Sequence, residues 1–134
     1  MTPTTTALLG FAGWYLLLTF ALGVFRSSLV LSGKKAANTF AADGSDVGAF
    51  GQRLSRARDN CYETLPLFAA IALAASIAGK LEVLDPLAPY VLCARIGQSV
   101  THLVSTSLMA INVRFVFFIV QVVIYAIWIL RLLG

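Results

Sequence analysis

Apolar residues fill four long stretches of the chain, and short polar segments separate them. The stretches cover residues 7–31, 60–79, 87–111 and 115–133. A helix needs about 20 apolar residues to cross a bilayer, so each stretch is long enough for a transmembrane helix. Helical periodicity extends the second helix backwards to about Val47. The pattern predicts an all-α integral membrane protein, with a four-helix transmembrane bundle that forms one domain over residues 1–134.

The three predicted connections differ in length. The first, at residues 32–46, is polar and contains glycine, which is typical of a surface loop. The second, at residues 80–86, is a short turn whose last residue, Pro86, suits the start of the next helix. The third lies near residues 112–113. Because it is so short, we expect the third and fourth helices to be antiparallel neighbours.

Basic residues mark one end of the predicted bundle. The first and third connections and the adjoining helix ends carry Lys34, Lys35, Arg53, Arg56, Arg58 and Arg114, whereas the opposite side carries only Lys80 and Arg131. The positive-inside rule therefore puts the basic end in the cytoplasm and both termini outside. We expect a multi-pass protein of the inner (cell) membrane, surrounded by lipid. The first apolar stretch is too long for a signal-peptide core, so it is expected to stay as the first helix.

Composition supports a lipid environment and argues against other classes. The chain is 59% hydrophobic and 12% charged, against about 45–50% and about 25% in soluble domains. The net charge is +4, but the basic residues flank apolar runs instead of forming one patch, so no nucleic-acid partner is predicted. Cys61 and Cys93 lack the spacing of a metal or redox motif, and we predict no metal.

Two of the predicted helices carry a polar stripe. The stripe of the second helix has the spacing i, i+3, i+7 and i+10 and consists of Arg53, Arg56, Asn60 and Glu63. The stripe of the third helix has the same spacing and consists of Arg95, Gln98, His102 and Ser105. Residues at this spacing share one helix face. We expect the two stripes to face each other and to line a polar cleft at the cytoplasmic end.

The charge of this cleft predicts an anionic ligand. An arginine at the centre of a spanning helix costs about 2.5–3.5 kcal/mol, so Arg95 needs a partner, and Glu63 is the acidic residue within the stripes. Arg53, Arg56 and Arg114 leave the cleft with a surplus of positive charge. Two structural readings stay open: arginines near helix ends can reach lipid headgroups, and Arg95 with Glu63 could form a purely structural ion pair.

The second helix also carries a recognisable signature. From Arg53 to Phe68 it reads Arg-x-x-Arg-Ala-x-x-Asn-Cys-x-Glu-x-x-Pro-Leu-Phe. This closely resembles the signature of the family of membrane-associated proteins in eicosanoid and glutathione metabolism (MAPEG). The resemblance extends over the chain, through its length, its four spans, the basic loop and Ala94-Arg95. It implies a left-handed four-helix bundle, assembled as a homotrimer, that binds glutathione between adjacent subunits at the cytoplasmic side.

The resemblance also implies roles for individual residues. By position, the residues that look like glutathione ligands are Arg56, Asn60, Glu63 and Arg95, and those that look like further contacts to its anionic groups are Lys35 and Arg53. Arg114 looks like the catalytic arginine that stabilises the glutathione thiolate. Where leukotriene-forming members have tyrosines, this chain has Gln98 and His102, which are expected to take their place in the site. This departure favours a general transferase of bacterial type over an eicosanoid-specific enzyme.

These observations lead to one main hypothesis and two alternatives. The main hypothesis is a trimeric glutathione transferase that conjugates glutathione to hydrophobic electrophiles in detoxification, with glutathione peroxidase activity as a second reaction. One alternative is a non-catalytic protein of the same fold that binds lipid or an anion. The other is a small multidrug transporter. That class would need an isolated membrane carboxylate, ideally in the first helix, which here carries Arg26 and no acidic residue.

Overall fold

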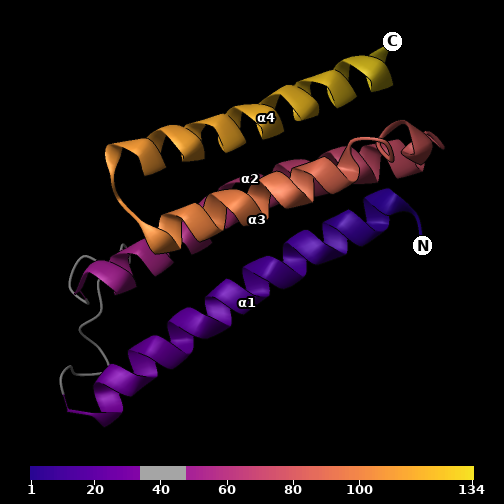
Figure 1. Cartoon of the computed structure of the whole chain (residues 1–134). Helices are drawn as coiled ribbons and strands as arrows, with labels where there is room; N and C mark the ends of the chain where they lie inside the picture. The colour runs from indigo at the N-terminus through magenta and orange to yellow at the C-terminus, as the bar shows by residue number, and fades with distance from the viewer. Residues whose placement is uncertain (34–47) are drawn as a thin grey trace.

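The chain folds into four long helices. The computed structural model describes residues 1–33 and 48–134. The helices within them are α1 (Pro3–Leu31), α2 (Gly48–Ile77), α3 (Ala88–Val104) and α4 (Leu108–Leu133), with a short 3-10 helix, η1 (Leu81–Val83), between α2 and α3 (Figure 1). The predicted all-α, four-helix architecture is confirmed.

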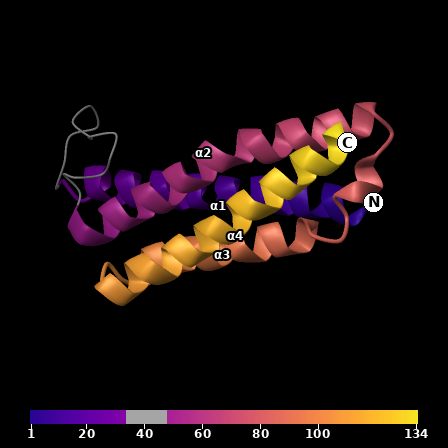
Figure 2. The same cartoon turned by 90° about the horizontal axis from the view of Figure 1, so that it is seen from above.

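The helices run along a common axis and alternate in direction (Figures 1 and 2). Both termini and the turn between α2 and α3 lie at one end, and the turn between α3 and α4 lies at the other. We call this second end, which also contains the first turns of α2, the basic end. Helices α3 and α4 pack against each other along their length, so the prediction of antiparallel neighbours is confirmed.

The outer surface of the bundle is apolar. Large side chains such as Leu16, Phe20 and Val116 are more than half exposed. Three of the described helices, α1, α2 and α4, are long and apolar enough to cross a membrane. Helix α3 has 17 residues. A surface with this much exposed apolar area is stable in lipid and not in water, so the protein is a membrane protein.

Helix α1 begins earlier than the hydropathy pattern predicts, at Pro3 instead of residue 7. The reason is capping: the Thr2 hydroxyl accepts a hydrogen bond from the backbone N–H of Thr5, and Pro3 occupies the first helical turn. The carboxylate of Asp85, in the turn before α3, accepts from both the backbone N–H (3.1 Å) and the hydroxyl (2.6 Å) of Thr4. These two hydrogen bonds therefore connect the start of α1 to the turn before α3.

The boundary between α3 and α4 also differs from the prediction. The third span was expected to continue to Ile111, but α3 ends at Val104 and α4 begins at Leu108. Ser105 is extended, and its hydroxyl accepts from the N–H of Ser107 at 3.0 Å. The Ser107 hydroxyl in turn accepts from the third N–H of α4 as its N-cap. Ser105 thus belongs to the turn and not to the polar stripe of α3.

The core contains a cluster of aromatic rings and, nearer the basic end, several buried polar side chains. Rings of Phe11, Phe68, Tyr125 and Trp128 pack with centroids 5.4–6.2 Å apart, and they join α1, α2 and α4. Nearer the basic end, Gly97 lets α3 and α4 approach closely. A Cβ atom there would lie 2.8 Å from Cζ of Phe117. On either side of this contact, the buried polar residues Arg95, Gln98 and His102 share the interior with apolar side chains.

Candidate functional site

A chain of three polar side chains crosses the basic end from α2 to α4. The imidazole of His102, on α3, lies between the other two: its Nε2 is 2.7 Å from Nδ2 of Asn60 on α2, and its Nδ1 is 2.7 Å from Nη1 of Arg114 on α4. His102 is only 7% exposed. The predicted meeting of the two polar stripes is confirmed at this point, since Asn60 and His102 come from different stripes.

Deeper in the bundle, Arg95 organises a second polar network. It is fully buried, and its guanidinium donates from Nε to Oε1 of Gln121 (3.1 Å) and from Nη2 to the hydroxyl of Thr64 (2.8 Å). The Gln121 amide donates onward to Oε1 of Gln98 (2.9 Å). The guanidinium also lies over the ring of Phe11, 5.6 Å from its centroid. Arg95 therefore joins all four helices.

The partners of Arg95 differ from the one expected from the sequence. Glu63 was the expected counter-charge, but the guanidinium contacts amide and hydroxyl oxygens instead. The reason is geometric: Thr64, the next residue of α2, faces the bundle interior, while Glu63 is exposed on the outer face. Nη1 of Arg95 is buried and has no hydrogen-bond partner among the described residues.

Two of the predicted ligands lie on the outside of the bundle. Arg56 and Glu63 are both exposed and are two turns apart on α2. Within the described part of the chain, neither side chain forms an ion pair. A carboxylate on the outer face of a spanning helix is costly in lipid unless a partner covers it. These two residues are thus available to a ligand or to another protein chain.

The remaining predicted residues have different surroundings. Nε of Arg53 donates to the backbone carbonyl of Leu103 at 3.0 Å, which places a cation at the C-terminal end of α3. A positive charge is favourable there because it complements the helix dipole. Arg58 pairs with its neighbour Asp59. Lys35, the predicted further contact to an anionic group, lies outside the described residues.

Sequence reasoning overlooked two members of the polar core, Gln121 and Thr64. Gln121 is the one amide in the apolar stretch of residues 115–130, so a signal for it exists in the sequence. A single amide at that depth is expected to seek an internal hydrogen-bond partner, because lipid provides none. Thr64 gives no comparable signal, since a threonine hydroxyl commonly bonds within its own helix.

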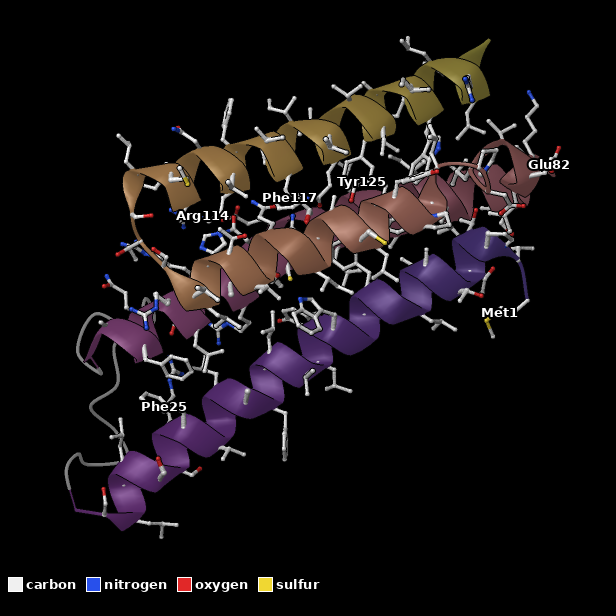
Figure 3. The ribbon with its side chains drawn as sticks, in the orientation of Figure 1. Met1, Phe25, Glu82, Arg114, Phe117 and Tyr125 are labelled. Carbon is white, nitrogen blue, oxygen red and sulfur yellow. The ribbon has the colours of Figure 1, made fainter. Side chains whose placement is uncertain are left out.

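Arg114 has the features of a site for a developing negative charge. It is half-buried near the start of α4 and points toward α2 and α3 (Figure 3). Its Nε is buried and has no hydrogen-bond partner among the described residues. A guanidinium held in a region of low dielectric attracts an anion more strongly than one in water. The arrangement can therefore stabilise a thiolate, a carboxylate or another small anionic group.

The comparisons with known proteins agree with this architecture. A family model described as the MAPEG family matches residues 4–134, which is essentially the whole chain. Comparison with curated proteins and with solved structures found no match. The family match covers all four helices, including the stripes of α2 and α3 and the arginine of α4. The chain belongs to the MAPEG family of membrane proteins.

Proposed function

We propose that this protein is a membrane glutathione transferase. In the reaction, the glutathione sulfur forms a bond to the carbon of a hydrophobic electrophile, the leaving group departs with its electron pair, and the thiol proton passes to solvent. As a second activity, two glutathione molecules reduce a hydroperoxide to an alcohol and water and become a disulfide. Membership of the MAPEG family supports both reactions at the level of the family.

The proposal rests chiefly on the surroundings of the Arg114 guanidinium. A free thiol has a pKa of about 8.5 and is a poor nucleophile until it ionises; a nearby guanidinium favours the thiolate. Arg114 is held by His102 and keeps a buried N–H without a partner in the described residues. In the proposed complex this donor faces the glutathione sulfur. The low dielectric of the bundle strengthens the attraction.

The rest of the ligand would lie along α2. Glutathione has two carboxylates and one ammonium group. The exposed guanidinium of Arg56 suits a carboxylate, and the exposed Glu63 suits the ammonium. Because both residues are on the outer face of α2, we propose that the site is completed by a second copy of the chain, in a homotrimer. The basic end would face the cytoplasm, where glutathione is abundant, and the electrophile would enter from the lipid.

The experiment is a glutathione titration of the purified protein in detergent, followed by the ultraviolet absorbance of the thiolate. Wild type is compared with Arg114→Met and with Arg131→Met. Arg131 is the matched control, since it is an exposed arginine near the other end of the same helix. We expect a saturable thiolate signal in wild type and in Arg131→Met. In Arg114→Met we expect that signal to disappear, and turnover of a chlorodinitrobenzene substrate to fall about 10²-fold.

Three outcomes would contradict the proposal. If folded wild-type protein binds glutathione without forming thiolate, the protein is a carrier or binding protein of the same fold. If it does not bind glutathione at all, the cationic end serves another anion or a lipid headgroup. An equal loss of signal in both arginine variants would show that net charge, and not the position of Arg114, matters.

A further inference from the structure

The contacts of His102 restrict where its proton can be. A guanidinium has only hydrogen-bond donors, so Arg114 must donate to Nδ1 of His102. Nδ1 is then unprotonated. A neutral imidazole carries its single proton on the other nitrogen, so Nε2 of His102 is a donor. The arginine of α4 thus sets the tautomer of the histidine on α3.

The same reasoning fixes the amide of Asn60. With a proton on Nε2, the group 2.7 Å away must accept a hydrogen bond. An amide nitrogen cannot accept, but rotating the amide by half a turn exchanges nitrogen and oxygen at nearly the same positions. That rotation replaces the 3.2 Å hydrogen bond from Nδ2 to the backbone carbonyl of Arg56 by a contact between two acceptor oxygens, but that carbonyl keeps its hydrogen bond within the helix. Two donors facing each other at 2.7 Å would be far less favourable.

We propose that His102 is a positioning residue that couples Arg114 to Asn60. This inference rests on the proposed function. Arg114 donates to His102, His102 donates to Oδ1 of Asn60, and Nδ2 of Asn60 is left to donate to the ligand. The site then presents two donors, the guanidinium for the sulfur and the amide N–H for a peptide carbonyl. The favoured ligand is a peptide thiol with a carbonyl acceptor, and an amine or ammonium group is disfavoured at Asn60.

Burial makes the relay hard to replace. His102 is 7% exposed, so water cannot easily take over its two hydrogen bonds. The charged groups around the ring are the arginines of three helices, Arg56, Arg95 and Arg114. Protonating Nδ1 would place a fourth cation among these arginines. It would also make the N–H on Nδ1 face the N–H donor of Arg114. Neutral His102, with one acceptor and one donor nitrogen, is the arrangement that satisfies both of its partners, Arg114 and Asn60.

The hydrogen-bond chain from Arg114 through His102 to Asn60 can be tested without glutathione. The chain contains a single histidine, so a histidine label reports on His102 alone. Protein labelled with ¹⁵N only in histidine gives NMR signals from His102 alone. In wild type we expect an unprotonated Nδ1 and a protonated Nε2. Arg114→Met should change the tautomer, and Arg131→Met should not. A protonated Nδ1 in wild type, or an unchanged tautomer in Arg114→Met, overturns the proposal. This arm fails or succeeds independently of whether glutathione binds.

The consequence for turnover is tested with variants of both partners. Asn60→Asp still accepts from Nε2 but cannot donate to the ligand. We expect the tautomer to persist and glutathione affinity to fall at least about tenfold, because one hydrogen bond of about 1.4 kcal/mol is lost and a negative charge is added. His102→Leu should lower kcat about 10²-fold because Arg114 loses its orientation. His102→Gln, which keeps a donor and an acceptor, should recover part of that loss. Wild-type kcat and thiolate signal in folded His102→Leu would refute the coupling.

Discussion

The buried amide of Gln121 is predicted to stabilise the bundle by satisfying Arg95. Gln121 is fully buried and accepts from the guanidinium while donating to Gln98. Gln121→Leu fills a similar volume but removes both interhelical bonds. The buried cation then keeps Thr64 as its hydrogen-bond partner among the described residues. The substitution should therefore cost more than the loss of an ordinary polar contact.

The size of the loss follows from the two bonds. A hydrogen bond to a charged group contributes about 1.5–3 kcal/mol and a neutral one about 0.5–1.5 kcal/mol. Interhelical bonds in membranes average about 0.6 kcal/mol, because the unfolded chain also finds partners. We expect Gln121→Leu to lower the free energy of unfolding by about 2–3 kcal/mol, between these scales.

The assay is unfolding of the detergent-solubilised protein by SDS, followed by helical circular dichroism. Gln52→Leu is the control, because Gln52 is half-buried and has no hydrogen-bond partner among residues 1–33 and 48–134. A third variant removes the cation as well. Arg95→Met with Gln121→Leu leaves no buried charge unpaired, so it should be more stable than Gln121→Leu alone. The reasoning is refuted if Gln121→Leu and Gln52→Leu have the same free energy of unfolding. It is also refuted if the double variant loses as much stability as Arg95→Met and Gln121→Leu lose separately, added together.

Two further predictions concern helix contacts outside the polar core. Asp85→Ala should lower stability by about 1–3 kcal/mol, because the Thr4 hydroxyl and N–H at the start of α1 lose a charged acceptor; faster hydrogen exchange confined to the first turn of α1 would check this. Gly97→Ala should be less stable than Gly13→Ala by about 1–3 kcal/mol, since a Cβ at residue 97 meets the Phe117 ring at 2.8 Å and one at residue 13 meets nothing within 4 Å. SDS unfolding measures the difference, and Phe117→Leu should reduce it.

Hydropathy and periodicity predict the helices of this protein well, but not where they end. The four helices follow from apolar length, a property that each segment carries by itself. The turn at Ser105 to Ser107 escaped prediction because hydroxyl groups are only weakly polar on a hydropathy scale. Their effect comes from local bonds to backbone N–H groups. Capping geometry, and not the loss of hydrophobicity, sets that boundary.

The site was predictable where both partners lie on marked helix faces. The spacing of the stripes brought Asn60 and His102 to facing positions, and the structure has them in contact. Spacing on one helix cannot tell which neighbouring helix lies opposite. Charge alone assigned Arg95 an acidic partner on α2, whereas its guanidinium donates to Gln121, which comes from α4. Long-range packing decides such pairings, and the sequence marks Gln121 only as an amide among apolar residues.

The shortness of α3 has a consequence for the shape of the surrounding membrane. Its 17 residues rise about 25 Å, less than the roughly 30 Å of a typical hydrocarbon layer. A span that is too short draws the lipid headgroups inward or lets water follow the polar turn. Since α3 ends beside His102, we expect any thinning at the basic end, where Arg114 lies. A water-soluble peptide could then reach the guanidinium of Arg114 from the aqueous side of the thinned bilayer, while a hydrophobic substrate approaches from the adjacent lipid.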